Sequence, residues 1–201
     1  MPILIPMALF AFTFSISPGP VNMLTLSAGV HHGVRRSIPF ILGASIGFTS
    51  LLVLVGLSAQ VLAGLNPIWL KALGLIGAAI IVYFGYRIAT APPRLDASAA
   101  PDLPRFSQGA LLQAANPKAW AACLAAVSLF ELAGAPARLA IFVGLYFLIC
   151  LIGVGSWAVL GQGIRRFLSN PERMRLFNGL VGGTLILLAG LMAADSLLQL
   201  P

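Results

Sequence analysis

The stretch Ser17-Pro18-Gly19-Pro20-Val21-Asn22 interrupts an apolar run that otherwise has the length and composition of a membrane-spanning helix. Two prolines around a glycine break such a helix, because each proline lacks a backbone N–H and its ring clashes with the carbonyl one turn earlier. About a hundred residues later, Asn116-Pro117-Lys118 interrupts a second apolar run in a comparable place. Proline-broken apolar segments at matching places in two halves of a chain are typical of the substrate site of a transporter.

The composition is that of an integral membrane protein. Of the 201 residues, 59% are hydrophobic and 8% are charged, whereas a soluble domain has roughly 25% charged residues. The net charge of +7 does not indicate a nucleic-acid-binding protein, because the basic residues are scattered between apolar runs instead of gathered on one face. They are expected beside the spans, where they contact anionic lipid head groups on the cytoplasmic side.

Residues suited to catalysis or metal binding do not form a recognisable group. Cys123 and Cys150 both lie inside apolar segments, and the pair His31-His32 adjoins a loop, where a solvated role is expected. The sequence has no Ser-His-Asp set, no paired carboxylates and no phosphate-binding glycine loop. It therefore predicts no enzyme, no cofactor and no metal site.

Charge-free apolar runs predict six membrane helices. They span about residues 1–30 with the first break, 38–64, 68–89, 107–130 with the second break, 139–164 and 176–198. The only long polar stretch, with four prolines and four charged residues, is predicted to be a linker. The predicted units are a first three-helix repeat over residues 1–90, a cytoplasmic Pro-rich linker over 91–105 and a second three-helix repeat over 106–201.

Six spans distribute the basic residues of the loops unequally, with nine Lys and Arg on one side and two on the other. The loops after the first, third and fifth helices are therefore predicted to be cytoplasmic, and both termini outside. Because each half has an odd number of helices, the second half enters the membrane in the opposite sense. The predicted fold is an all-α integral membrane protein: six transmembrane helices as two inverted three-helix repeats with broken helices 1 and 4, and a site between the repeats.

The two breaks carry polar groups in an otherwise apolar region. Asn22 and Asn116 place amides there, Ser15 and Ser17 add hydroxyls, and Lys118 adds a charge. A Lys at that depth costs about 2.5–3.5 kcal/mol on insertion, which favours function over the alternative, a structural pairing with freed carbonyls. Half-helix N-termini attract a carboxylate and carbonyls attract an ammonium group, so a zwitterionic amino acid satisfies both. The predicted substrate site comprises Ser17, Pro18, Gly19, Pro20, Asn22, Asn116, Pro117 and Lys118.

Small residues and outer carboxylates give further expectations. Gly43-xxx-Gly47 predicts that another helix approaches closely, either within the bundle or between subunits. Gly29-xxx-Gly33 and Gly179-xxx-Gly183 leave the same two alternatives open, and a homodimer is one of them. Glu131 and Asp195 lie near the outer ends of their helices, where solvation at the head groups is favoured over a proton relay. A role in an outer gate is a further alternative for Asp195.

The motifs together resemble the LysE/RhtB family of amino-acid exporters. The resemblance rests on Pro18-Gly19-Pro20 with Asn22, Gly33 and Arg35-Arg36, Gly43-xxx-Gly47, Leu70-Lys71, Gly77-Ala78-Ala79, Gly85, Phe106, Gly109 and Asn116-Pro117-Lys118-Ala119. It implies a multi-pass exporter of the bacterial inner membrane that moves amino acids or close derivatives outward, driven by the proton motive force. The chain departs from many members at Phe48, where they have a polar or acidic residue, and at Ile80, where they have Tyr.

Two other functions remain as alternatives at this point. The first is a non-transporting membrane scaffold or assembly protein, in which the breaks serve folding and partner binding. The second is an exporter of metal or inorganic ions, which the lack of an intramembrane cluster of carboxylate, His or Cys ligands disfavours. A largely apolar lining with few fixed charges favours a small neutral amino acid as substrate over Lys or Arg.

Overall fold

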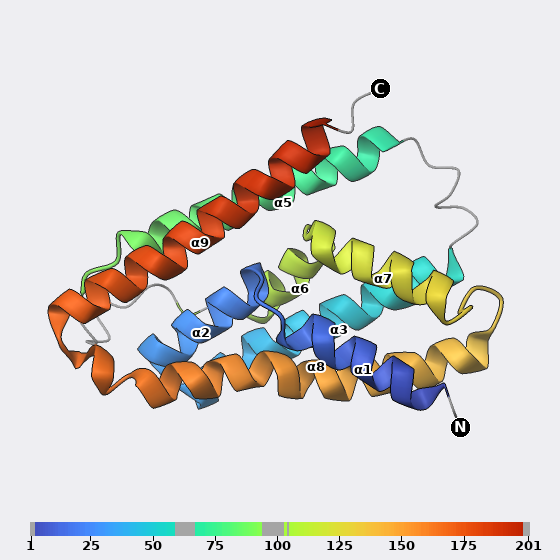
Figure 1. Ribbon diagram of the computed structural model, residues 1–201, viewed down its shortest axis with the longest axis horizontal. Helices are drawn as coiled ribbons and strands as arrows, with labels where there is room; N and C mark the ends of the chain where they lie inside the picture. Colours follow the sequence, from blue (N-terminus) through green and yellow to red (C-terminus); the bar gives the residue numbers. More distant parts are fainter. Residues whose placement is uncertain (1–2, 59–66, 94–102, 104, 199–201) are drawn as a thin grey trace.

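The computed structural model describes residues 3–58, 67–93, 103 and 105–198, which form helices and turns and contain no strand. The first half contains α1 (Leu4–Ile16), α2 (Pro20–His32), α3 (Val34–Leu57) and α5 (Pro67–Ala89). The second half contains α6 (Phe106–Ala114), α7 (Pro117–Leu129), α8 (Pro136–Ile164), the short 3-10 helix η1 (Phe167–Ser169) and α9 (Pro171–Leu198). These helices lie lengthwise in one elongated bundle (Figure 1).

Several helices have the length and apolar character of membrane spans. Val34–Leu57, Pro136–Ile164 and Pro171–Ala194 each meet both conditions, and α1 with α2 forms a fourth span if the pair, bent by 60°, is counted as one. Apolar side chains also cover the outside of the bundle: Leu148 and Ile152 of α8 are 60% and 70% exposed. Such a surface suits lipid. The all-α, multi-pass membrane fold is thereby confirmed, whereas six spans in two inverted repeats stay a prediction.

The two long helices α3 and α8 contact each other and run in opposite directions. The ring of Phe48 in α3 stacks on that of Tyr146 in α8, with 4.2 Å between ring centroids. Further along α3, Gly56 faces Leu139, which lies earlier in α8. Residue numbers that rise on one helix and fall on the other define an antiparallel pair.

The first broken helix, α1 with α2, runs parallel to α8. Gly153 of α8 contacts Ser15 near the end of α1, and Gly161 contacts the backbone of Leu26 in α2. Glycine is needed at both positions, because a Cβ at Gly153 would lie 2.7 Å from the Cβ of Ser15 and a Cβ at Gly161 would overlap the carbonyl oxygen of Leu26.

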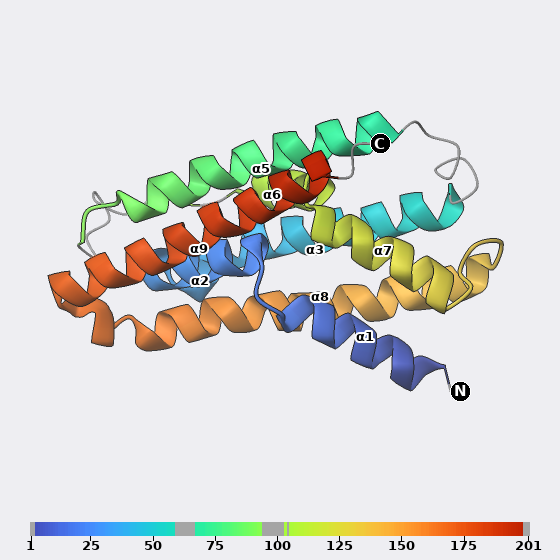
Figure 2. The same cartoon turned by 45° about the horizontal axis from the view of Figure 1, so that its top comes forward.

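The second broken helix begins with α6, which runs parallel to α3. Gly43 and Gly47 of α3 face the α6 backbone, where a Cβ on Gly43 would overlap the Phe106 carbonyl oxygen and one on Gly47 would lie 2.7 Å from the Cα of Ala110. Both glycines therefore pack within the bundle. Since α3 and α8 are antiparallel, the two broken helices run in opposite directions. Helices α5 and α9 lie side by side along one edge (Figure 2).

Three expectations from the sequence are corrected by the helix boundaries. The only interruption between the first two spans is Gly33, with φ of 79°, so Arg35 and Arg36 lie within α3 and not in a loop. The sequence predicts a second helix that starts at about residue 38, with Pro39 in its first turn, whereas Pro39 lies inside α3. His31 belongs to α2 and is only 4% exposed, so it is not solvated. Charged residues mark the edge of the hydrocarbon layer, but hydrogen bonding continues the helix beyond that edge.

The last two helices also begin earlier than the charge pattern predicts, at Pro136 and at Pro171. Proline suits the first position of a helix, because the N–H that it lacks has no intrahelical partner there. Most of the predicted linker, residues 94–102 and 104, and the side chain of Asp195 lie outside the described residues.

Candidate functional site

The structure brings the two helix breaks together across about a hundred residues of sequence. The Lys118 ammonium nitrogen in the first turn of α7 lies 2.7 Å from Ser17 Oγ, 3.2 Å from the Ser17 carbonyl oxygen and 3.1 Å from that of Pro18. All three acceptors lie in the segment between α1 and α2. Gly19 keeps this approach open, since a Cβ there would lie 3.2 Å from the Lys118 Nζ atom.

The carbonyls freed by the first break also find donors in other side chains. The amide nitrogen of Asn22 donates to the carbonyl oxygens of Ser15 at 2.8 Å and Ser17 at 2.9 Å. The indole N–H of Trp157, in α8, donates to the carbonyl oxygen of Ile16 at 3.1 Å. In hydrocarbon such carbonyls must be paired, so these donors make the break a stable part of the fold.

The second break has a similar arrangement. Asn116 caps α7, because its side-chain oxygen accepts a hydrogen bond from the backbone N–H of Lys118 at 3.1 Å, and Pro117 occupies the first helical position. The indole N–H of Trp120 donates to the carbonyl oxygen of Ala114 at 2.7 Å. The break therefore exposes the N-terminal end of α7, which carries a partial positive charge.

The donors of Asn22 allow a direct test of this arrangement. Asn22 is 5% exposed, and Asn22→Asp leaves at most one O–H for the two carbonyls that the amide serves. An unpaired buried carbonyl costs about 1–3 kcal/mol, so we expect the thermal midpoint of the detergent-solubilised protein to fall by about 2–12 °C.

The matched control is Asn170→Asp at the start of α9. There the side-chain oxygen only accepts, from the backbone N–H groups of Glu172 at 2.8 Å and Arg173 at 3.4 Å, and a carboxylate accepts equally well. Equal midpoints for the two variants would contradict the role given to the Asn22 amide.

A cavity lies at the meeting point of the breaks. Its empty volume is about 410 Å³, including its open mouth. Polar side chains line part of it, and apolar and aromatic side chains line the rest. The lining residues are Phe14, Ser15, Gly19, Pro20, Val21, Asn22, Phe48, Gln113, Asn116, Lys118, Ala119, Ala122, Tyr146, Cys150 and Val154.

Five of the residues predicted for the site line this cavity: Gly19, Pro20, Asn22, Asn116 and Lys118. The other three, Ser17, Pro18 and Pro117, are not part of its lining. Ser17 and Pro18 hold the ammonium group of Lys118, and Pro117 begins α7.

Sequence reasoning missed part of the lining. Gln113 precedes Asn116 by three residues, and a polar side chain one turn from a helix break was a usable signal. Phe48, Tyr146 and Cys150 come from α3 and α8, and nothing in the sequence placed them beside the breaks. Ser15 contributes a buried hydroxyl that has no hydrogen-bond partner in the described part of the chain.

A second cavity lies beside α2, nearer its C-terminal end. It has an empty volume of about 480 Å³ and is lined by residues of α2, α5 and α6, including His31, Tyr83, Arg87 and Gln108. His31 Nε2 lies 3.3 Å from the side-chain oxygen of Asn178, whose amide nitrogen donates to the Ala91 carbonyl oxygen at 3.4 Å. With the Asn178 amide in this orientation, Nε2 donates to its side-chain oxygen.

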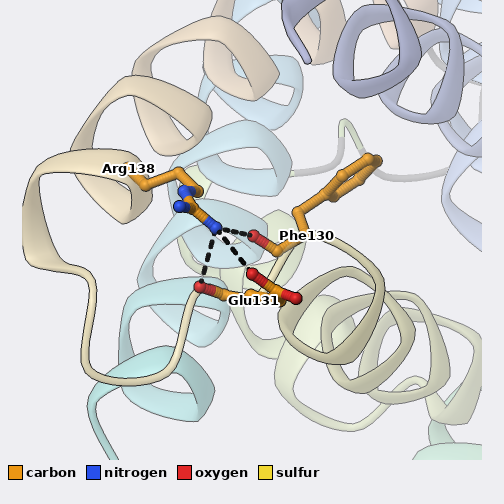
Figure 3. A network of polar contacts seen from close by, with 3 residues as sticks. All are labelled: Phe130, Glu131 and Arg138. Carbon is orange, nitrogen blue, oxygen red and sulfur yellow. Dashed lines mark hydrogen bonds and ion pairs between the residues drawn. The ribbon is translucent and has the colours of Figure 1, made fainter.

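The far end of α7 is closed by a separate polar network (Figure 3). One guanidinium nitrogen of Arg138 donates to the carbonyl oxygens of Phe130 at 3.1 Å and Glu131 at 3.4 Å, and lies 3.3 Å from a carboxylate oxygen of Glu131. The Glu131 side chain is 84% exposed. This ion pair is distant from the cavity lining and caps the C-terminal end of α7.

Comparison with known proteins agrees with these features. A sequence model of the family described as LysE type translocator matches residues 12–196. The cysteine/O-acetylserine efflux protein of Salmonella typhimurium strain LT2 is 36% identical over 169 residues, which cover 80% of this chain and 86% of that protein. The protein of the same name from Escherichia coli strain K12 is 33% identical over 155 residues, covering 76% and 78%. No solved structure matches the chain significantly. The chain belongs to the LysE type translocator family, and is a transporter and not an enzyme.

Proposed function

We propose that this transporter exports small neutral amino acids or close derivatives across the bacterial inner membrane, from the cavity between the two helix breaks. The observation that carries the proposal is the meeting of opposite helix ends in one cavity. The segment after α1 presents carbonyl oxygens that hold the ammonium group of Lys118. Helices α2 and α7 begin at Pro20 and Pro117, and their N-terminal ends lie beside the same cavity. Acceptors for an ammonium group and positive ends for a carboxylate match the backbone part of any amino acid.

The size and lining of the cavity support a small neutral substrate. No Asp or Glu occurs among the lining residues, so a second positive charge, as in Lys or Arg, has no carboxylate partner there. The stacked rings of Phe48 and Tyr146 bound one side. The buried hydroxyl of Ser15 suits a short polar side chain. Because two relatives are named cysteine/O-acetylserine efflux protein, we choose L-cysteine and O-acetyl-L-serine as the first compounds to test.

In this proposal the conformational change is a movement of two inverted repeats against each other. The repeats are residues 1–90 and 106–201, joined by the linker 91–105. Two observations support them: the broken helices run in opposite directions, and each lies parallel to the long helix of the other half. Rocking of one repeat against the other would then expose the cavity alternately to the two sides. The cytoplasmic position of the loops after the first, third and fifth helices, the external termini and a homodimer remain predictions.

The test is efflux of a preloaded panel of labelled compounds from bacterial cells that make the protein or carry an empty vector. The panel contains L-cysteine, O-acetyl-L-serine, L-alanine, L-threonine, L-lysine and L-arginine. We expect faster loss of a small neutral compound, which a protonophore slows because outward transport is coupled to the proton motive force. Equal loss of every compound in the two strains, with the protein present in the membrane, would refute amino-acid export and favour the scaffold alternative.

Neither alternative function is favoured by a specific contact. No group of three or more His, Cys, Asp or Glu side chains suited to a metal ion occurs in the part of the chain that the structure describes, so metal export is not proposed. A transporter and a scaffold differ in their response at Lys118: export requires its ammonium group, whereas partner binding on the outer surface does not.

A further inference from the structure

The ammonium group of Lys118 is fully paired with neutral acceptors. It has three N–H donors, and three oxygens lie within hydrogen-bonding distance: the Ser17 hydroxyl at 2.7 Å, the Pro18 carbonyl at 3.1 Å and the Ser17 carbonyl at 3.2 Å. We call these three oxygens the ammonium cluster. No carboxylate of the described residues contributes to it.

The ammonium cluster recognises an ammonium group and not lysine in particular. Its oxygens belong to the backbone and to a short side chain just beyond the C-terminal end of α1, where the helix dipole adds partial negative charge. The stem of Lys118 approaches it from α7 past Gly19, and both residues line the cavity. Ser17 and Pro18 lie outside the cavity lining, whereas Lys118 is part of it, so another primary ammonium group in the cavity reaches the same three oxygens by displacing that of Lys118.

The cavity lining offers the ammonium group of an amino acid no carboxylate partner. It contains neither Asp nor Glu, and the side-chain oxygen of Asn116 already caps α7. The carbonyl oxygen of Ser15, which is not part of the ammonium cluster, is likewise paired, with the side-chain amide of Asn22. An incoming α-ammonium group that is not paired with strong acceptors would lose several kcal/mol of hydration.

From this geometry, and resting on the function proposed above, we propose that the ammonium cluster is the subsite for the α-ammonium group of the substrate, and that Lys118 occupies it as a resident ligand while the transporter is empty. Binding exchanges one ammonium group for another. The displaced Lys118 side chain, which starts at the N-terminal end of α7, then pairs with the substrate carboxylate.

The exchange keeps the buried polar groups paired in both states. In the structure, Lys118 pairs with Ser17 and Pro18 and connects α7 to the break between α1 and α2. With substrate bound, the α-ammonium group satisfies the same oxygens and the carboxylate satisfies Lys118. The tie across the two breaks is thus released only when a zwitterion replaces it.

A chemical replacement of the missing side chain tests this proposal. Lys118→Ala removes three carbons and one nitrogen, which is the composition of n-propylammonium. We expect n-propylammonium chloride to raise the thermal midpoint of the purified variant saturably, by about 2–5 °C, and to leave that of the wild type unchanged. Sodium propionate and 1-propanol, which lack the ammonium group, should have no such effect on either protein.

Equal shifts in wild type and variant, or none in the variant, would overturn the proposal. If Lys118→Ala inserts poorly, we compare its yield in the membranes of cells grown with n-propylammonium and of cells grown with 1-propanol. A yield that n-propylammonium does not raise above the yield with 1-propanol would also overturn the proposal. Because these measurements follow stability and not transport, an amino-acid panel without efflux would refute the proposed function and leave the result on the ammonium cluster standing.

Discussion

Replacement of Lys118 by Ala is expected to lower the efflux of the exported compound by at least about 30-fold while the protein still reaches the membrane. The substitution leaves the ammonium cluster of Ser17 and Pro18 without its resident donor and removes the partner of the substrate carboxylate. Truncation of one partner of a buried, hydrogen-bonded charge costs about 2–5 kcal/mol, and each 1.4 kcal/mol corresponds to about a factor of ten in affinity. The measurement is the initial efflux rate per amount of membrane-inserted protein.

The matched control for this experiment is Arg175→Ala. It also removes one positive charge, but from an exposed position on α9 outside the cavity lining. We expect its efflux rate to stay within a factor of about two of wild type, because exposed substitutions have small effects. Comparable losses of efflux rate in the two variants would indicate that the rate depends on the net charge of the protein and not on the contacts of Lys118.

The second large effect is expected at Gly43, where Gly43→Val should prevent stable folding. The new Cβ would overlap the carbonyl oxygen of Phe106, a backbone atom that moves only if α6 moves. Overpacking in a well-packed interior costs about 1–3 kcal/mol, and more when backbones must separate. Because α6 leads directly into the second break, we expect a loss of folded protein in the membrane of about tenfold, measured by size-exclusion chromatography of a fluorescent fusion.

Gly144→Val is the control for Gly43→Val. Gly144 lies in α8, and a Cβ there would meet nothing within 4 Å. Both substitutions place a β-branched side chain in a membrane helix, so the intrinsic cost in helix propensity is the same. Similar yields of the two variants would contradict the close packing of α3 against α6.

The breaks could be predicted from the sequence because their signals are local. Proline removes a backbone donor wherever it stands in a helix, and a Lys in an apolar run needs polar partners in any fold. The sequence therefore identified Pro18, Pro20, Pro117 and Lys118 as special without a structure. It also indicated that the freed carbonyls must be paired, but not by which side chains: Trp157, the partner of the Ile16 carbonyl, lies about 140 residues away in α8.

The rest of the cavity could not be predicted, because it depends on how helices pack. Phe48, Tyr146 and Cys150 reach the breaks only because α3 and α8 cross there, and an aromatic side chain that lines a cavity has the same local pattern as one that packs in a core. The burial of His31 was missed for a similar reason. The sequence shows two adjacent histidines before a glycine, whereas burial of the first depends on Asn178, which belongs to the last helix.

The most direct test of the account is release of a labelled small neutral amino acid, starting with L-cysteine and O-acetyl-L-serine, from proteoliposomes that contain the purified protein. The account predicts that vesicles with wild-type protein release the compound much faster than protein-free vesicles. It further predicts that an imposed proton motive force increases the rate of release. It also predicts that the Lys118→Ala protein, reconstituted to the same density, releases the compound no faster than protein-free vesicles. Release by wild type and Lys118→Ala at equal rates, or by neither for any compound of the panel, would contradict export through the site between the two broken helices.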